Sequence, residues 1–120
     1  MEKTVYREIR SYTTKDGSTI RELMHPDVHG NANQSLAEAV VPVGVRTELH
    51  YHHESEEIYH FTEGRGKMRL ENEVFDVEPG DTVCIAPGAK HNILNTGDVP
   101  LRLLCCSAPP YSHEDTELVL

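Results

Sequence analysis

Residues 44–64 read GVRTELHYHHESEEIYHFTEG, and three of their side chains fall at the spacing of metal ligands. His50 and His52 are two residues apart, so on a β-strand both side chains point to the same face. Glu57 follows after four intervening residues, and a hairpin through residues 54–56 returns it beside the histidines. Two imidazoles and a carboxylate that converge on one point suit a divalent transition metal. The stretch therefore predicts a metal site on one face of a β-structure.

A further histidine, His91, follows a turn at Pro87 and Gly88. For His50 and His52 alone, a metal site competes equally with exposed or hydrogen-bonded histidines on an edge strand, because short motifs often match by chance. The addition of Glu57 and His91 favours the metal. The other histidines are given no role at this point: His25, His29, His53, His60 and His113.

The rest of the chain alternates short β-forming runs with turns that contain Gly, Pro, Asn or Asp. Runs of this length at regular turn spacing are typical of an all-β sandwich or barrel. We expect strands at residues 37–43, 46–52, 57–62, 67–70, 74–77, 82–86, 92–94 and 101–107. No helical periodicity extends over several turns. We expect a polar loop at 25–34 and no strand in the tail at 109–117.

The composition excludes several classes of function. The chain has 120 residues, the length of one domain, with 20 acidic and 11 basic side chains and a net charge of −9. This balance argues against nucleic acid and anionic membranes as partners, because both need clustered Lys and Arg. We expect no membrane span, since no window approaches about 18 apolar residues. An N-terminus without an apolar stretch and three cysteines without metal-ligand spacing predict a cytoplasmic protein with free thiols.

At this point the chain resembles the cupin superfamily, whose two sequence motifs it carries in order. The first motif is matched at Gly44, His50, His52, Glu57 and Gly64. The second motif is matched at Gly80, Gly88, His91 and Asn95, with Pro87 one place later than the motif has it. The resemblance implies a double-stranded β-helix, the jelly-roll barrel. It also implies one divalent ion, such as zinc, manganese, iron or nickel, held by His50, His52, Glu57 and His91.

The resemblance and the strand pattern divide the chain into three parts. We expect an N-terminal extension and loop packed on the barrel at residues 1–34, the cupin barrel at 35–107 and a C-terminal tail at 108–120. Asn95 is expected to satisfy polar groups of the second hairpin. Met68, Ile85 and Ile93 are expected in the core. A homodimer is expected from the resemblance and because the apolar run at 101–105 needs a cover at the sheet edge.

Residues in phase with the ligands are the candidates for the pocket wall. Counting by two from His50 gives Glu48 and Arg46, and counting from Glu57 gives Tyr59 and Phe61. We take Arg46, Tyr59 and Phe61 as substrate-binding candidates, and Glu48 and Tyr59 as weak catalytic candidates. The alternative for each is packing or solvent exposure, and a β-bulge would break the count. A phosphorylated substrate would need Arg46, Arg21 or Lys90 at the barrel mouth.

Three functions remain open on this reading, because a fold does not decide a reaction. The first is a metal-dependent enzyme for a small polar substrate, such as a sugar or sugar-phosphate isomerase. The second is an iron-dependent dioxygenase or a decarboxylase with the same ligands. The third is a non-catalytic module that binds or senses a small molecule. In every case the expected partner is a small molecule.

Overall fold

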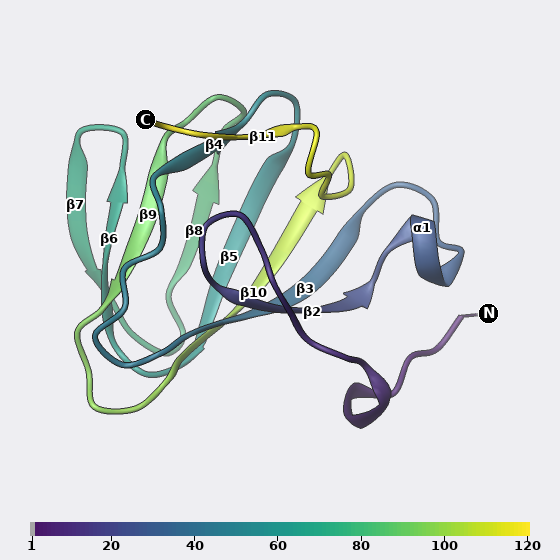
Figure 1. Ribbon diagram of the computed structural model, residues 1–120, viewed down its shortest axis with the longest axis horizontal. Helices are drawn as coiled ribbons and strands as arrows, with labels where there is room; N and C mark the ends of the chain where they lie inside the picture. The colour runs from purple at the N-terminus through teal and green to yellow at the C-terminus, as the bar shows by residue number, and fades with distance from the viewer. Residues whose placement is uncertain (1) are drawn as a thin grey trace.

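Two antiparallel sheets make up the computed structural model, which describes residues 2–120 (Figure 1). The six-stranded sheet runs, in spatial order, through β1 (Tyr12–Thr13), β2 (Thr19–Met24), β3 (Ser35–Val41), β10 (Leu101–Ala108), β5 (Glu56–Glu63) and β8 (Thr82–Ile85). The five-stranded sheet runs through β11 (Thr116–Leu118), β4 (His50–His52), β9 (His91–Asn95), β6 (Gly66–Leu70) and β7 (Glu73–Val77). This architecture confirms the all-β jelly roll.

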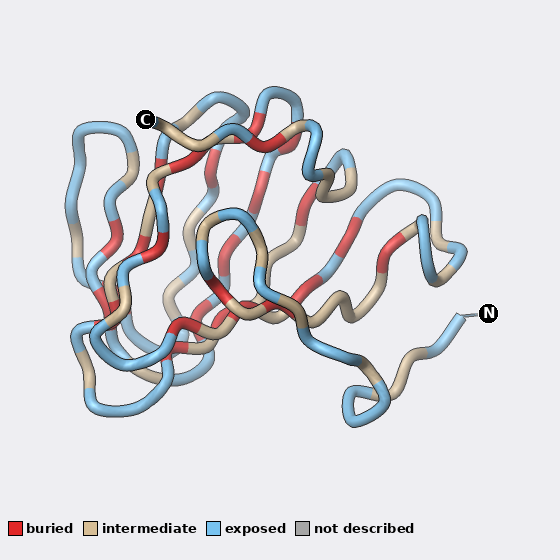
Figure 2. The backbone as a smooth tube through the Cα atoms, viewed as in Figure 1, coloured by how far each residue is buried: buried red, intermediate tan, exposed pale blue. Residues whose placement is uncertain are grey.

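Strands form where the sequence alternates, because one face of each sheet is buried against the other sheet. Along β5, Glu57, Tyr59 and Phe61 are buried, whereas Ile58 and His60 are exposed (Figure 2). The core between the sheets contains Met68, Ile85 and Ile93, as predicted, and they are 0%, 1% and 4% exposed. The alternation of side chains therefore brings polar and apolar residues of one strand face into the same interior.

Asn95 ties three loop and strand groups together inside the barrel, as expected. Its Nδ2 donates to the carbonyl oxygens of Val41 and Val99, both at 2.9 Å, and its Oδ1 accepts from the backbone N–H of Gly97 at 2.9 Å. The side chain is 2% exposed. Buried backbone groups need such partners, so the role of Asn95 is structural.

All eight expected strands are present as β3 to β10, although β4 covers only the end of the expected 46–52, and the ends of the chain differ from the expectation. Strand β2 pairs with β3 inside the six-stranded sheet, and β11 pairs with β4. Neither was predicted, because β2 has only one fully buried position and β11 has three residues. A short helix, α1 (Pro26–His29), lies in the expected polar loop, with Pro at its start and Gly30 at φ 85° at its end. Such short elements are stabilised by their neighbours more than by their own pattern.

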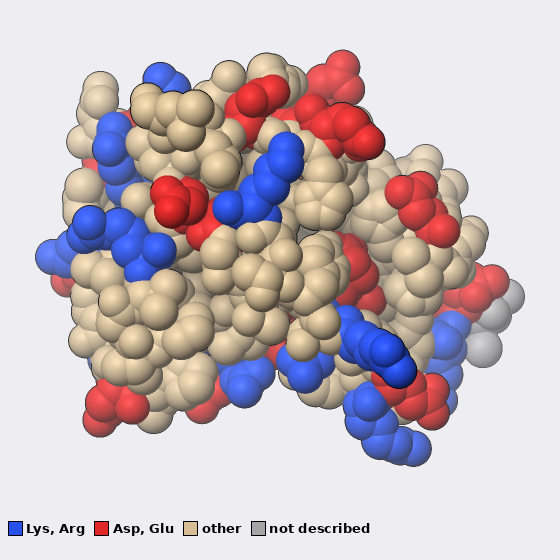
Figure 3. Space-filling view, in the orientation of Figure 1, with Lys and Arg blue, Asp and Glu red and all other residues tan. Residues whose placement is uncertain are grey.

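One of the two reasons for expecting a homodimer, an apolar strand at a sheet edge, does not hold. Strand β10 lies between β3 and β5, so its apolar run is covered inside the barrel and is not at a sheet edge. The homodimer itself stays a prediction, which light scattering tests. None of the helices in residues 2–120 is long and apolar enough to cross a membrane. On the face shown in Figure 3, Lys and Arg side chains are interspersed with Asp and Glu.

Candidate metal centre

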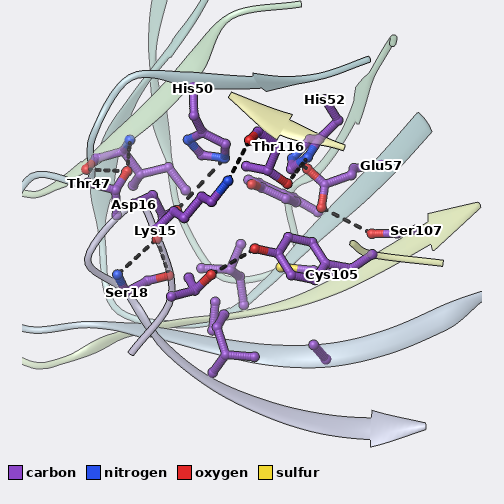
Figure 4. Close-up of a pocket in the computed structure, with 18 of the residues that line it drawn as sticks. Lys15, Asp16, Ser18, Thr47, His50, His52, Glu57, Cys105, Ser107 and Thr116 are labelled. Carbon is purple, nitrogen blue, oxygen red and sulfur yellow. Dashed lines mark hydrogen bonds and ion pairs between the residues drawn. The ribbon is translucent and has the colours of Figure 1, made fainter. Parts of the chain in front are cut away.

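Four buried side chains from three strands meet inside the barrel, and Figure 4 shows three of them, His50, His52 and Glu57. His50 and His52 come from β4, His91 from β9 and Glu57 from β5. His50 lies directly opposite His91 in the β4–β9 pair, so register places both rings on one face. The expected hairpin is wrong, because β4 and β5 lie in different sheets; the loop between them crosses the barrel, and Glu57 faces the histidines from the opposite sheet. The four side chains are at most 4% exposed.

The inward-pointing atoms of this cluster lie close together without satisfying one another. One ligand atom from each residue lies within 4.8 Å of the others. His52 Nε2 is 2.7 Å from Glu57 Oε1, and His91 Nε2 is 3.4 Å from the same oxygen. None of these three atoms makes a hydrogen bond of acceptable geometry, although all three are sealed from solvent. Buried polar atoms without partners are rare, and three that converge on one point fit a bound cation.

The outer nitrogen of each histidine is already engaged. His50 Nδ1 contacts the carbonyl oxygen of Glu48 at 2.9 Å, and His91 Nδ1 contacts that of Ala89 at 2.8 Å. His52 Nδ1 contacts Thr116 Oγ1 at 2.9 Å, and that hydroxyl donates its proton to the carbonyl of Ser112. Each Nδ1 must therefore carry the ring proton and donate it to these oxygens. Every Nε2 then has a free lone pair. This tautomer is the one that binds a metal through Nε2.

Charge in the cluster also favours metal binding. Burial, and then the neighbouring His91, lower the pKa of His50 to about 4, so its ring is neutral at pH 7. Burial alone would raise the pKa of Glu57, but His52 and His91, which face its carboxylate, outweigh burial and hold that pKa well below its usual range. Ser107 Oγ donates to Glu57 Oε2 at 3.1 Å, which leaves Oε1 facing the histidines.

Three imidazoles and one carboxylate are a donor set that suits a divalent ion, and their unpartnered atoms face one another. His50, His52, Glu57 and His91 would hold it. Four protein ligands on an octahedral ion leave about two positions for other molecules. The geometry does not select among zinc, manganese, iron and nickel.

A cavity of about 620 Å³, its open mouth included, extends from the histidines across the barrel. Its walls are mixed: aliphatic side chains from both sheets, three tyrosines, and several carboxylates and hydroxyls. The residues used below are Tyr12, Lys15, Asp16, Glu22, Tyr59, Cys105 and Tyr111.

Asp16 is the acidic side chain beside the cluster that the sequence did not single out. It lies in the turn between β1 and β2, where Oδ1 accepts from the backbone N–H and the hydroxyl of Ser18 at 2.9 and 2.6 Å. Its Oδ2 is 3.9 Å from His50 Nε2 (Figure 4). The sequence shows only a turn at residues 15–18. Nothing local indicates that the turn folds over the barrel mouth.

The predicted pocket residues separate into two groups. Tyr59 lines the cavity, whereas Phe61 is 0% exposed and packs in the apolar core below it. Arg46 and Glu48 are exposed and lie outside the cavity wall, and Thr47 lines the cavity instead. Residues 47–49 do not form a strand, so two buried positions, Thr47 and His50, are three residues apart. The count by two fails at that irregularity.

The two other candidate phosphate-binding residues, Arg21 and Lys90, and the histidines without an assigned role do not line the cavity. Arg21 stacks over the ring of Tyr6 at 5.1 Å, and Lys90 is exposed and outside the wall. His60 points outward, as predicted, and contacts Thr82. His53 lies at the surface near Glu117. His25 and His113 hold Tyr111, through its carbonyl oxygen and its hydroxyl respectively.

Comparisons with known proteins agree with this geometry. A family model described as a cupin domain matches residues 37–107. An uncharacterized protein, MJ1618, from Methanocaldococcus jannaschii is 60% identical over 117 residues, which cover 98% of this chain and 94% of that protein. The protein SchB from Streptomyces halstedii is 32% identical over 106 residues, which cover 84% of this chain and 77% of SchB.

Two solved structures show the same fold. The polyketide cyclase RemF from Streptomyces resistomycificus superposes with a TM-score of 0.83 at 21% identity, over 100% of this chain and 86% of RemF. An oxalate decarboxylase from Lactobacillus farciminis superposes with a TM-score of 0.82 at 24% identity, over 95% of this chain. This chain spans about a third of the decarboxylase, 34% of its length.

Proposed function

Because the chain belongs to the cupin family, we propose that it is a metal-dependent enzyme for a small, oxygen-rich substrate. The reaction is a proton transfer on an unphosphorylated hydroxy-carbonyl compound, of the kind that a sugar isomerase catalyses. The two compared structures are a decarboxylase and a cyclase, so the fold does not choose the reaction. The proposal rests on the residues of the cavity.

The observation that carries the proposal is the position of Asp16. Ser18 fixes the carboxylate through Oδ1, and Oδ2 points toward the histidine cluster, 3.9 Å from His50 Nε2. A substrate bound at the open metal positions would lie against this oxygen. A fixed carboxylate in such a place takes a proton from a carbon next to a carbonyl group and returns it to the neighbouring atom.

The charges around the cavity favour a substrate without phosphate. Asp16, Glu22 and Glu57 line the wall, and Lys15 is the one Lys or Arg among the described residues there. The amine of Lys15 already donates to the carbonyl oxygens of His113 and Thr116, at 2.7 and 2.9 Å. A phosphate group would therefore meet carboxylates without a free cation to balance it.

A divalent ion in this centre would supply polarisation of a carbonyl or hydroxyl oxygen of the substrate. The protein supplies the rest. Tyr59 and the aliphatic walls exclude water from the reacting end, because Tyr59 is 5% exposed and belongs to the core. Asp16 holds and moves the proton.

The test measures how fast deuterium from the solvent replaces carbon-bound hydrogen in candidate substrates. We expect the metal-loaded protein in D2O to put deuterium next to the carbonyl group of one member of a panel of unphosphorylated aldoses, ketoses and α-hydroxy ketones, as NMR measures. Asp16→Asn should slow this exchange by about 10²–10⁴-fold, since it removes the proton acceptor. The metal content should stay unchanged, because the four ligands remain. Asp76→Asn, a change at an exposed side chain far from the cavity wall, is the matched control.

Other outcomes would contradict the proposal in distinct ways. Exchange at the wild-type rate in Asp16→Asn removes Asp16 from the reaction. Oxygen uptake by the iron-loaded protein, or release of carbon dioxide from an acid, would favour the dioxygenase or decarboxylase. Tight binding of a panel member without exchange would favour a non-catalytic binding module.

A further inference from the structure

Glu22 places a second carboxylate in the cavity, away from the histidine cluster. It lies on β2, opposite Ala37 of β3, and Ala37 lies opposite Cys105 of β10. Cys105 in turn lies opposite Tyr59 of β5. Partners in register share a face of the sheet, so this row points into the barrel. Ala37 and Cys105 are small, and they leave open space between Glu22 and Tyr59.

The two oxygens of Glu22 differ in their partners. Oε1 accepts a hydrogen bond from the hydroxyl of Tyr12 at 3.0 Å. Oε2 is sealed from solvent and has no hydrogen-bond partner among residues 2–120. Burial raises the pKa of Glu22, as expected for a carboxyl group that lacks a second partner. A buried carboxylate oxygen without a donor is costly, and a ligand that donates to it would remove that cost.

The row geometry sets the length of such a ligand. Glu22 and Glu57 lie on strands three spacings apart, about 14 Å across the sheet, and Glu57 is two residues along β5 from Tyr59, the member of this row. Both side chains reach inward and shorten the gap between their oxygens. A molecule with one ring and its substituents fills what remains. The rings of Tyr12, Tyr59 and Tyr111 line the cavity and offer faces for such a ring.

From these contacts we propose that Glu22 is a specificity-determining residue, which binds a hydroxyl group at the end of the substrate remote from the metal. The substrate then has two oxygens that chelate the ion, a compact ring or chain between the tyrosines, and a hydroxyl that donates to Glu22 Oε2. This inference rests on the proposed function, because it uses the open metal positions. It adds to the proposed function a feature of the substrate that the open metal positions do not define, the hydroxyl group at its remote end.

The test uses two chelators that differ in one hydroxyl. Kojic acid and allomaltol both chelate through an adjacent carbonyl and hydroxyl, but only kojic acid carries a hydroxyl on the substituent across the ring. Calorimetry on the zinc-loaded full chain should give about tenfold tighter binding of kojic acid, the effect of a hydrogen bond to a charged group. In Glu22→Leu this preference should disappear, while the affinity for allomaltol stays unchanged.

Two further variants separate recognition from folding. Glu22→Gln keeps the shape of the side chain and should give an intermediate preference, because its single oxygen must serve both Tyr12 and the ligand. Glu48→Leu removes an exposed acid outside the cavity wall and should keep the full preference. Equal binding of the two chelators by the wild type, or a preference that survives in Glu22→Leu, overturns the role of Glu22 but leaves the proposed function intact. Failure of both chelators to bind refutes the open metal positions, and this inference with them.

Discussion

At the scale of single residues, the centre depends on which histidine nitrogen carries the proton. Backbone carbonyls hold Nδ1 of His50 and His91, and Thr116 holds Nδ1 of His52. Neutral rings with Nε2 turned inward bind a metal, but they are costly to protonate inside the barrel. The metal-free protein should therefore become less stable in acid.

The first prediction concerns this acid sensitivity. Burial and His91 lower the pKa of His50 from 6.5 to about 4, so the unfolded chain binds more protons between these values. The free energy of unfolding should be highest above about pH 6.5. It should decrease by up to about 3 kcal/mol as the pH falls to about 4. Urea titrations of metal-free protein in the presence of a chelator measure it.

Substitution distinguishes His50 from the other titrating groups. His50→Gln should flatten the fall between pH 6.5 and 4, because a neutral amide does not titrate. His60→Gln should leave the curve unchanged, since His60 is exposed and contacts only Thr82. Identical slopes in the wild type and His50→Gln would assign the acid sensitivity to other groups. Glu57 affects stability at a lower pH than His50, because the stability that comes from its low pKa is lost as the pH falls below about 4.5.

At the scale of elements, the turn between β5 and β6 links the two sheets and passes close to the start of β10. Gly64 has φ 85°, a conformation that side chains with a Cβ rarely adopt. A Cβ at this position would lie 2.8 Å from the carbonyl oxygen of Pro100 and 3.0 Å from Leu101 Cα. Gly80 has a similar φ, 97°, but nothing lies within 4 Å of its Cβ position.

The second prediction compares these two glycines. Gly80→Ala should cost about 1–2 kcal/mol of unfolding free energy, which is the cost of the left-handed conformation alone. Gly64→Ala should cost about 1–3 kcal/mol more, because the backbone of β10 must also move. Urea denaturation measures both values. Equal losses of unfolding free energy in the two variants would show that Pro100 moves away from the new Cβ without strain.

At the scale of the whole molecule, the centre is assembled by segments far apart in the sequence. Thr116 is 64 residues from His52 and reaches it because β11 pairs with β4. The carboxylate Asp16 comes from the opposite end of the chain. Its turn is fixed to the site by the hydrogen bond from the N–H of Glu48 to the carbonyl of Asp16, at 2.8 Å. Both ends of the chain therefore shape the candidate site.

The third prediction tests this long-range support. Thr116→Val removes the hydroxyl that orients His52 and should weaken metal binding by about 10–100-fold, as for other partners of metal ligands. Competition with a fluorescent zinc chelator measures the affinity. Thr82→Val removes an equivalent threonine–histidine contact at the surface, to His60, and should leave the affinity unchanged. Equal affinities in both variants would show that His52 needs no such support.

The sequence by itself determined the barrel strands and the four residues that meet at the centre. Alternating side chains in β3 and in β5 to β10 identify their inward faces without knowledge of the neighbours. The shared face of His50 and His52 follows from the same alternation, Glu57 was placed by the expected return of the chain after His52, and His91 was implied by the family resemblance. Local geometry is sufficient for these features, because a strand has a fixed period of two.

Only the tertiary structure decided the rest of the candidate site. Asp16, Glu22 and Thr116 lie on a turn or short strands whose sequence carries no strong pattern, and packing places them on the cavity or its ligands. Glu48 and Arg46 failed as cavity residues because the backbone irregularity at residues 47–49 breaks the period. Alternation predicts which way a side chain points within one strand. Which distant segments close over that strand depends on contacts that the local sequence does not encode.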